Sequence, residues 1–295
     1  MDPERKHSYT KKFSMKSIER RNFTVSIDGS DTSEYAFDLV QENFLTPFDS
    51  LYAFYIFNSK KDSKFNYKNK KEIIDGKYKD KISLLNIPSI HFLTEDRTSE
   101  IHPLEQTHTF AIRKKSDFLI CGFTGMKGPR GDNMELTKGI DYLLKSCQVP
   151  FILIKDKTVR KERKDGKYRW LCVIDNGLSN ANSAFEKFLP LIETEKDELF
   201  TISMLKYEGQ KDYNEEVFIE TCKDHDIKNY TYENFVIGKN GASSKKINKT
   251  INFEENPYDF VILLNNRAVY TNELEKSDNF SIIGNSKCNI CVLNQ

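Results

Sequence analysis

The chain has 295 residues, enough for two domains of ordinary size. Its composition, 38% hydrophobic and 30% charged, predicts a soluble globular protein, and no apolar run is long enough to span a membrane. Lysine and arginine (45) nearly balance aspartate and glutamate (44), so net charge gives no reason to expect nucleic acid or a membrane as a partner. The charged first residues lack the apolar core of a signal peptide, which predicts a reducing compartment such as the cytoplasm.

The segment Met1 to Arg21 has no apolar periodicity and holds seven basic and three acidic residues, a net charge of seven minus three, or +4. Such a composition is typical of a disordered, solvated tail. The alternative is a basic arm that becomes ordered on an acidic protein surface, with Tyr9, Phe13 and Met15 as apolar anchors. No base-stacking pattern of aromatic residues accompanies the charges, so a protein partner is favoured over nucleic acid.

Short apolar runs alternate with amphipathic patterns in the first predicted domain, residues 22–157. In chain order they predict a strand at 23–27, a helix after the turn Asp28-Gly29-Ser30, a strand at 51–57, a lysine-rich loop leading into a short helix at 58–80, a strand at 90–93 and a helix at 101–115.

A glycine-rich segment then follows a fourth apolar run, Phe118–Cys121. The run is short enough for a buried parallel strand, and a helix at 135–146 and a strand at 151–154 complete a βαβ unit. In such a unit the loop backbone and the helix N-terminus can hold a phosphate. If the strand ending at Ile27 neighbours this one, Asp28 faces the glycine loop, which is where an open parallel sheet binds its ligand. The alternative is that the glycines only form a long surface turn.

The segment Lys155 to Lys167 also carries seven basic and three acidic residues, with only Val159 as an apolar anchor, which predicts an exposed linker with a net charge of +4. Beyond it the pattern of the first domain repeats. Strands are predicted at 170–175, 199–205, 230–237, 258–264 and 288–293, and helices at 181–189 and 213–226. Residues 265–269, which follow the fourth strand of this copy, contain no glycine, so this copy lacks a phosphate loop.

Three segments resemble the universal stress protein family. They are V-S-I-D-G-S-x-x-S at residues 25–33, S-D-F-L-I-C-G-F-T-G at 116–125, and the helix-to-strand corner at 147–154. The resemblance covers Asn22 to about Lys157, with a weaker copy from Tyr168 to Gln295. It implies an α/β sheet of five parallel strands in each copy and, in many members of the family, bound ATP or AMP.

The resemblance assigns a nucleotide site to the first domain only. Gly122 and Gly125 fit the first half of the family motif, and Asp28 lies at the neighbouring strand end. Where the motif continues with glycine and serine or threonine, this sequence has Glu135, or, counted back from Pro150, Thr137 and Lys138. Thr137 can offer a hydroxyl to a phosphate, but neither residue gives the backbone the access that glycine gives.

The cysteines and histidines were considered as metal ligands. Cys288 and Cys291 form a CxxC pair, and Cys222 and His225 a CxxH pair, which together could ligate zinc. Buried free thiols are favoured over zinc, because the CxxC pair lies in a predicted strand whose side chains alternate between faces. The sequence thus predicts no metal site. It also contains none of the common catalytic motifs, so no enzymatic activity is predicted.

The sequence therefore predicts two Rossmann-like open five-stranded parallel-sheet domains with flanking helices, packed as a pseudo-dimer through their last strands. The expected divisions are a basic arm at 1–21, a first domain at 22–157, a basic linker at 158–167 and a degenerate second domain at 168–295. Two functions remain open. One is a non-catalytic scaffold whose arm and linker bind tubulin or other axonemal proteins in a cytoskeletal or ciliary assembly. The other is a regulatory protein that binds ATP or AMP through Asp28, Gly122, Gly125 and Thr137.

Overall fold

A computed structural model of the chain describes residues 20–60, 71–85, 87, 89–97, 100–124, 136–157, 165–175, 180, 182–205, 207–236, 249–250, 258–265 and 278–294. Within these residues, strands and helices alternate along the chain, and no helix has the length and apolar character needed to cross a bilayer.

The first half of the fold contains five strands. Its elements are β1 (Asn22–Ile27), α1 (Asp31–Leu39), a π-helical turn η1 (Val40–Phe44), β2 (Ser50–Phe57), α2 (Lys71–Leu85), β3 (Ile90–Asp96), α3 (Pro103–Arg113), β4 (Phe118–Gly122), α4 (Lys138–Ser146) and β5 (Phe151–Ile154).

The second half repeats this alternation. Its elements are β6 (Arg169–Asp175), α5 (Ser183–Phe188), a 3-10 turn η5 (Leu189–Leu191), β7 (Glu198–Leu205), α6 (Asn214–Asp224), β8 (Tyr230–Val236), β9 (Phe260–Asn265), α8 (Asp278–Asn285) and β10 (Asn289–Asn294).

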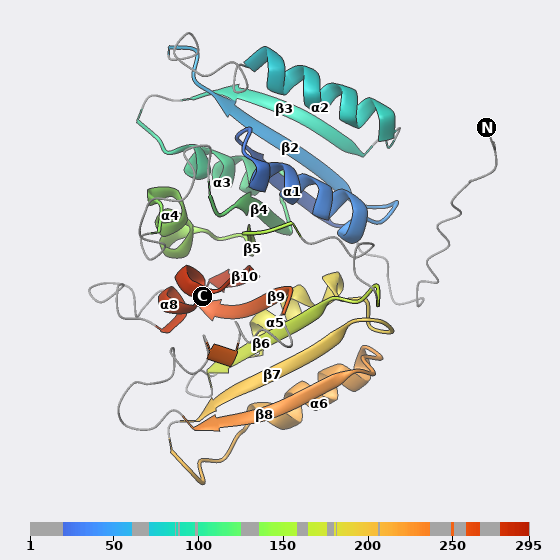
Figure 1. The fold of residues 1–295 in the computed structure, drawn as a ribbon, viewed down its shortest axis with the longest axis vertical. Coiled ribbons are helices and arrows are strands. Elements are labelled where there is room, and N and C mark those ends of the chain that lie inside the picture. Colours follow the sequence, from blue (N-terminus) through green and yellow to red (C-terminus); the bar gives the residue numbers. More distant parts are fainter. Residues whose placement is uncertain are drawn as a thin grey trace, which may run out of the picture.

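The ten strands of the described residues form one sheet, in the order β3-β2-β1-β4-β5-β10-β9-β6-β7-β8 (Figure 1). Neighbours within each half are parallel, whereas β5 and β10 are antiparallel, with Cys291 opposite Ile152 at the centre of the pair. The expected pairing of the two last strands is therefore confirmed. It covers the apolar edge that each half would otherwise expose.

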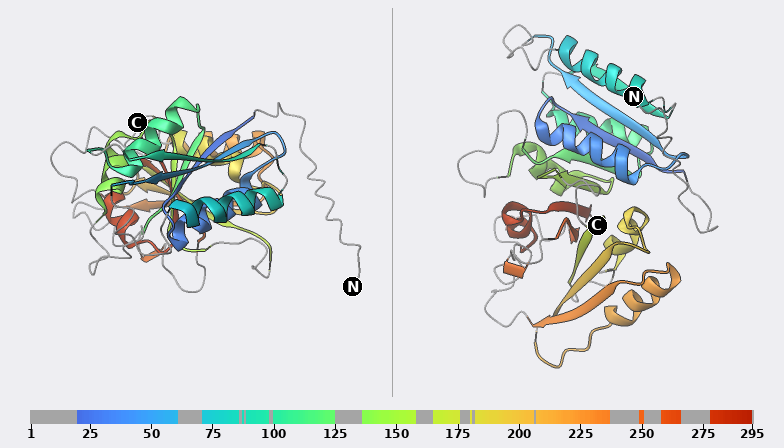
Figure 2. Two further views of the ribbon diagram at one scale, coloured as in Figure 1. Left: turned by 90° about the horizontal axis from the view of Figure 1, so that it is seen from above. Right: turned by 45° about the vertical axis from the view of Figure 1, so that its right-hand side comes forward.

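Helices cover both faces of the sheet, and each face carries one apolar cluster that continues through the β5–β10 junction (Figure 2). On one face α1, α2, α5 and α6 contribute side chains such as Phe37 and Phe218. On the other face α3, α4 and α8 contribute side chains such as Leu143 and Ile283. Phe44, at the end of η1, reaches across the junction to the rings of Trp170 (6.3 Å) and Phe260 (5.9 Å).

A buried aspartate fixes the start of the first strand of each half in the same way. Asp49, just before β2, accepts hydrogen bonds from the backbone N–H groups of Arg21 (2.8 Å) and Thr46 (2.8 Å). Asp197, just before β7, accepts from the backbone N–H groups of Tyr168 (3.0 Å) and Glu193 (2.9 Å). Both aspartates are fully buried, so these bonds replace water at a site that water does not reach.

A second pair of aspartates repeats in the same manner. Asp117, before β4, accepts from the backbone N–H of Asn22 at 2.8 Å, and Asp259, before β9, accepts from the backbone N–H of Arg169 at 2.8 Å. The two halves therefore begin their strands with the same devices, although their sequences resemble each other only weakly.

Each half also caps the last helix of the other. From the second half, the Asn294 amide donates to the carbonyls of Leu143 (2.8 Å) and Cys147 (2.9 Å), at the end of α4. From the first half, the Lys155 ammonium donates to the carbonyls of Ile283 and Ser286, at the end of α8. Carbonyls at the end of a helix lack some of their partners within that helix, and among the described residues the Leu143 carbonyl has only the Cys147 N–H (3.0 Å) besides Asn294. These side chains therefore stabilise both helix ends and the junction together.

Three sequence expectations differ from the structure. The helix expected to be short within 58–80 is α2, which continues to Leu85, and no helix was expected where α8 lies. The linker was expected to be exposed, but Lys155 is largely buried beneath α8, and Lys167 forms an ion pair with Glu198 at 3.2 Å. Arg20 and Arg21 likewise do not belong to a free arm, because they bind Ser50 and Asp49.

Candidate functional site

The predicted site lies at the carboxyl ends of β1 and β4, which are adjacent and parallel, with Val25 opposite Ile120. From β1 the chain moves outward to β2 and β3, and then crosses back to β4 on the other side. This reversal of strand order is the position at which open α/β sheets bind ligands. Asp28 follows β1 and Gly122 ends β4, so the structure brings these two predicted residues to the same edge.

Asp28 is engaged by its own turn. Its Oδ1 atom accepts hydrogen bonds from the backbone N–H of Ser30 (2.9 Å) and from the Ser30 hydroxyl (2.5 Å). The Ser30 hydroxyl in turn accepts from the backbone N–H of Ser33 (3.3 Å) and caps α1. Gly29, at φ 82°, allows the backbone to turn between strand and helix. The Asp28 carboxylate therefore stabilises the turn that leads into α1 and holds its N-cap residue, Ser30.

Gly122 is needed for contact with α1. A Cβ atom at this position would lie 2.3 Å from Thr32 Oγ1 and 3.2 Å from the backbone nitrogen of Ser33. The Thr32 hydroxyl passes over the glycine and donates to the carbonyl of Thr124 at 2.6 Å. The first turn of α1 thus packs directly on the end of β4, and the space that the glycine provides is filled by the protein itself.

Among the described residues, no contact joins Thr137 to this pair. Thr137 is the N-cap of α4, where its hydroxyl accepts from the backbone N–H of Ile140 at 3.4 Å. Gly125 lies in the segment 125–135, outside the described residues, so the glycine loop itself is not described.

His102 is a residue at this edge whose role the sequence did not reveal. It is the N-cap of α3, and its Nδ1 atom accepts from the backbone N–H of Leu104 at 3.2 Å. Burial, together with nearby Arg97, lowers the pKa of His102, which keeps Nδ1 free to accept. A Cβ on Gly139 would lie 2.3 Å from the His102 ring, so α4 packs closely on this cap. The signal that could have located the cap is Pro103, a residue favoured in the first helical turn.

The cysteines that were weighed against zinc binding in the sequence are not arranged around a common point. Cys288 and Cys291 belong to different apolar clusters, on opposite faces of the sheet, while Cys222 lies in α6. Burial raises the pKa of Cys222 to about 12 and raises the pKa of Cys288, so neither thiol is a ready ligand or nucleophile. Among the described residues, no three histidine, cysteine, aspartate or glutamate side chains gather as a metal site would require.

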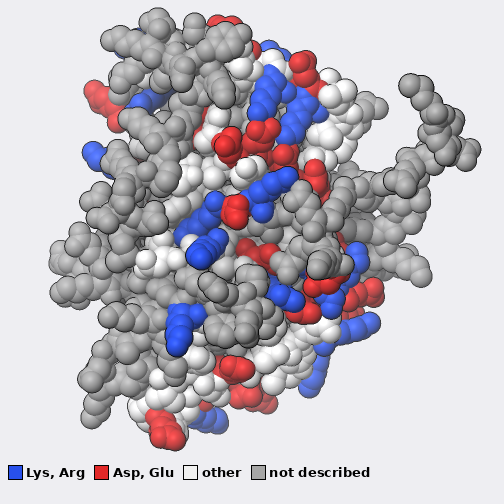
Figure 3. All heavy atoms as spheres, viewed as in Figure 1, with Lys and Arg blue, Asp and Glu red and all other residues white. Residues whose placement is uncertain are grey.

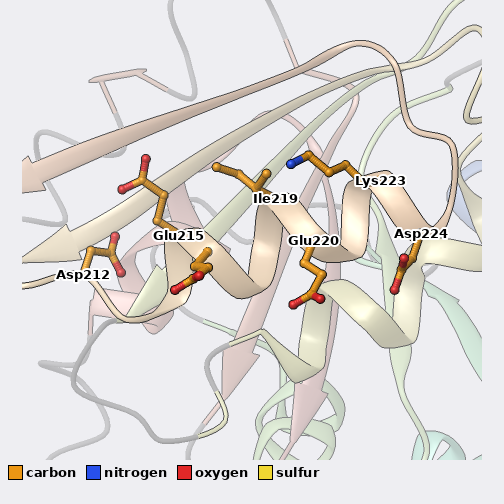
Figure 4. A pocket seen from close by; sticks show the side chains of 7 residues that line it. Asp212, Glu215, Ile219, Glu220, Lys223 and Asp224 are labelled. Atoms are coloured by element: carbon orange, nitrogen blue, oxygen red, sulfur yellow. The ribbon is translucent and has the colours of Figure 1, made fainter.

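A groove lies on the second half, along α6 (Figure 4). It has a volume of about 600 Å³ and is lined by Asp212, Glu215, Glu216, Ile219, Glu220, Lys223 and Asp224. We call it the acidic groove, because five acidic side chains face one lysine. The apolar pattern of the sequence predicts a helix here, at 213–226, but no groove. The spacing of Glu215, Glu216 and Glu220 within a helix was the available signal.

The chain matches no family model and no curated protein sequence, but it matches solved structures over most of its length. A universal stress protein from Archaeoglobus fulgidus DSM 4304 gives a TM-score of 0.62 at 17% identity, covering 92% of this chain and 98% of that one. A candidate universal stress protein from Pseudomonas aeruginosa UCBPP-PA14 gives 0.59 at 12% identity, covering 93% of each chain. A functionally unknown protein from P. aeruginosa PAO1 gives 0.61 at 12% identity, covering 93% and 92%. The chain therefore has a universal-stress-protein-like α/β fold.

Proposed function

We propose that this chain is a tandem universal-stress-protein-like scaffold, which acts by binding other proteins and catalyses no reaction. In this proposal the chain divides at 22–157 and 168–295, and the two domains are related by a pseudo-two-fold axis between Ile152 and Cys291. The repeated aspartates before β2 and β7, and before β4 and β9, support this division. So does the match to solved structures along the whole chain.

The observation that carries the proposal is that the carboxyl edge of each half is used internally. In the first half Thr32 occupies the space above Gly122. In the second half the strand equivalent to β4 is β9, which ends at the buried residue Asn265. The Asn265 amide donates to the Leu144 carbonyl of the first half at 2.9 Å. Side chains that would have to turn toward a nucleotide instead hold the fold together, which favours a scaffold over a nucleotide-binding protein.

The proposed partner surfaces are the basic arm, Met1 to Arg21, and the linker, Lys155 to Lys167, whose two end lysines are already bound within the fold. Because Arg20 and Arg21 anchor the arm to the first half, the charges left for a partner lie within residues 1–19, outside the described part of the chain. On the face shown in Figure 3, basic and acidic side chains of the described residues are interspersed, so the body presents no large basic patch there. An acidic protein surface, such as that of tubulin or another axonemal protein, is the proposed docking surface.

Deleting residues 1–19, while keeping Arg20 and Arg21, tests this proposal. We expect the truncated chain to keep the circular dichroism spectrum of the full chain but to lose its co-purifying partners at physiological salt. A matched control neutralises Lys145, an exposed lysine of the body that pairs with Asp141, and should retain the partners. If the truncated chain keeps the same partners, docking through the arm is wrong.

The second candidate function is ATP or AMP binding by the first domain alone. It is favoured by the position of Asp28 and Gly122 at adjacent strand ends, next to the capped N-terminus of α1. We expect mass spectrometry of the natively purified chain to find no nucleotide, and calorimetry with ATP to give no heat of binding. Binding that is lost in Gly122→Val would instead favour this second function.

A further inference from the structure

The outer face of α6 consists of Tyr213, Glu216, Val217 and Glu220, which are exposed on the side of the helix away from the buried Phe218. Tyr213, the N-cap of the helix, and Val217 are one turn apart and are 69% and 44% exposed. Side chains four residues apart lie next to each other on a helix, so these two form an apolar pair in solvent. A surface helix usually keeps its large apolar side chains on the buried face. The pair therefore points to a surface that another segment covers.

Acidic side chains border this apolar pair. Glu216 and Glu220 are four residues apart and line the acidic groove. In Figure 4, Glu220 and Asp224 project from α6 on the side opposite to Lys223. Like charges at this spacing destabilise a helix, and in the described part of the chain neither Glu216 nor Glu220 forms an ion pair that would offset the repulsion. A basic segment on the outer face would offset it.

The basic arm contains a segment with the same spacing and the opposite charge. Residues 9–16 read Y-T-K-K-F-S-M-K, and residues 213–220 read Y-N-E-E-V-F-I-E. In this alignment tyrosine matches tyrosine, phenylalanine matches valine, and a lysine takes the place of each of the three glutamates. The arm as a whole has no apolar periodicity, but a helix formed by these eight residues would present tyrosine, phenylalanine and two lysines on one face. The segment therefore complements the outer face of α6 in apolar contact and in charge.

The anchored end of the arm lies close to α6. Arg21 donates from Nη1 to the carbonyl of Pro190 at 2.8 Å, in the turn η5 that directly follows α5. Phe185 of α5 contacts Phe218 of α6, with ring centroids 4.9 Å apart. The turn η5 precedes β7 and the end of α6 precedes β8, so both lie at the amino edge of the sheet.

The arm is long enough to reach this helix. Packed helices lie about 8–10 Å apart, so α6 is one such step beyond α5. From the end of the segment at residue 16 to the anchor at Arg20 there are 20 minus 16, or four, residue steps, which span about 13–14 Å when extended. The segment can therefore bind α6 while Arg20 and Arg21 keep their bonds.

We propose that residues 9–16 of the arm bind the outer face of α6 in the same chain, as a short helix. Its lysines lie against Glu216 and Glu220, and its aromatic side chains cover Tyr213 and Val217. The own arm is favoured over the arm of a second copy, because the anchor holds it at a high effective concentration.

The docking itself does not depend on the proposed function, but its consequence does. While the arm is bound to α6, its lysines are not available to an acidic partner. The partner must therefore compete with Glu216 and Glu220, and α6 regulates the proposed partner surface.

The first experiment measures how fast chymotrypsin cleaves the full chain at the aromatic residues of the arm, relative to cleavage of the isolated arm peptide of the same sequence. Glu216→Lys with Glu220→Lys should raise the relative rate roughly fivefold or more, and so should Lys12→Glu with Lys16→Glu. Combining all four changes restores opposite charges and should return the rate close to that of wild type. No recovery in the combined variant, or a wild-type arm cleaved as fast as the free peptide, would overturn the proposal.

A matched control changes the same number of charges elsewhere. Glu72→Lys with Asp80→Lys alters two exposed acidic residues of α2, which packs near the β3 edge of the sheet, far from α6. We expect this variant to leave cleavage of the arm unchanged. An increase as large as that of the α6 variant would show a general effect of net charge and would contradict the proposal.

The second experiment separates apolar contact from charge attraction. Tyr213→Ala with Val217→Ala keeps every charge of the outer face and should raise the relative cleavage rate roughly threefold or more. Both side chains are exposed, so unfolding in urea should stay close to that of wild type. Tyr207→Ala is the control, because it removes a tyrosine that is 63% exposed but lies outside α6. An unchanged rate in the double variant would mean attraction by charge alone, and the proposal would fail.

The remaining measurements identify the occupant and separate the two proposals. Protection of the arm that grows with protein concentration would mean that the arm of one chain binds α6 of another, which would contradict docking within one chain. Glu216→Lys with Glu220→Lys should also increase the amount of co-purifying partner, whereas deletion of residues 1–19 should remove it. If the deletion removes the partner but the charge reversal leaves cleavage unchanged, only this inference fails. If cleavage responds as expected but the deletion keeps the partner, only the proposed function fails.

Discussion

The two halves of the sheet begin their strands in the same way and end them differently. At the amino ends, Asp49 and Asp197 occupy corresponding places and accept the same kinds of backbone hydrogen bond. At the carboxyl ends, the first half has the turn at Asp28 and the close contact at Gly122, whereas the second half has Asn265 bonded to the other half. The two halves therefore share the hydrogen bonds at the amino edge of the sheet and differ at its carboxyl edge.

The largest expected effect concerns the amino edge of the sheet, where the two halves make the same hydrogen bonds. Asp197→Ala removes an acceptor from the N–H groups of Tyr168 and Glu193 and from the Trp170 indole (3.1 Å), all at a buried site. We expect a loss of about 3–5 kcal/mol in the free energy of unfolding, measured with urea, and a similar loss for Asp49→Ala.

Lys196→Ala is the control for these variants, because its ion pair with Glu193 is exposed and should contribute only about 0.2–1 kcal/mol. If Asp197→Ala is nearly neutral while Asp49→Ala is strongly destabilising, the two amino edges are not equivalent, and the comparison between the halves is wrong.

The next largest effect concerns the carboxyl edge of the sheet, where the two halves differ. Gly122→Ala places a Cβ atom 2.3 Å from Thr32 Oγ1, so α1 must shift, and we expect a loss of about 1–3 kcal/mol. Thr32→Ala should recover part of that loss, since it removes the nearest atom. Gly122 pairs with Ile154 in the first half, as Leu264 pairs with Leu293 in the second half. The second half therefore has a leucine side chain at the position that corresponds to Gly122. Full stability of Gly122→Ala would contradict the packing described here.

A smaller effect is expected where the halves cap each other. Asn294→Ala removes the side-chain donor from the carbonyls of Leu143 and Cys147, although Leu143 keeps its bond from the Cys147 N–H. We expect a loss of about 1–2 kcal/mol in the free energy of unfolding. Hydrogen exchange at the end of α4 should become faster, while exchange at the end of α8, which Lys155 caps, should not change. Faster exchange at both helix ends would mean that the caps act as one unit.

The smallest effect depends on pH and concerns Lys155. Burial lowers the pKa of this lysine to about 8. Between about pH 8 and the ordinary lysine value of about 10.4, the unfolded chain binds more protons than the folded chain, so this residue makes the folded state more stable as pH rises. The difference in unfolding free energy between wild type and Lys155→Met should shift in favour of wild type by about 1 kcal/mol from pH 8 to pH 9. An unchanged difference would mean that Lys155 titrates normally.

The sequence was sufficient for the strands, because buried parallel strands appear as continuous apolar runs such as 151–154 and 170–175. The pairing of the two last strands was predictable because an apolar edge must be covered. The end of α2 was not predictable, since only Ile74 and Tyr78 of that helix are buried and its apolar pattern is weak. α8 was missed because it is a short helix of eight residues and includes a glycine.

The candidate site was predictable only in part. The strand ends that carry Asp28 and Gly122 were predictable from short apolar runs in the sequence, and the structure brings them to one edge of the sheet. The filling of that edge by Thr32 depends on a contact between residues far apart in the sequence, which no local pattern reports. The same holds for Lys155, whose carbonyl partners are 128 and 131 residues away. These contacts decide whether the edge is open to a ligand.

The position of β10 has a consequence for synthesis on the ribosome. β5 is complete at Ile154, but its partner strand begins at Asn289, which is 289 minus 154, or 135, residues later. At about 5–20 residues per second, the apolar edge of β5 stays without its partner strand for about 7 to 27 seconds. We therefore expect nascent chains stalled before residue 289 to be captured by chaperones, and chains stalled well beyond residue 295 on an added linker to be released. Equal chaperone capture of both would contradict this expectation.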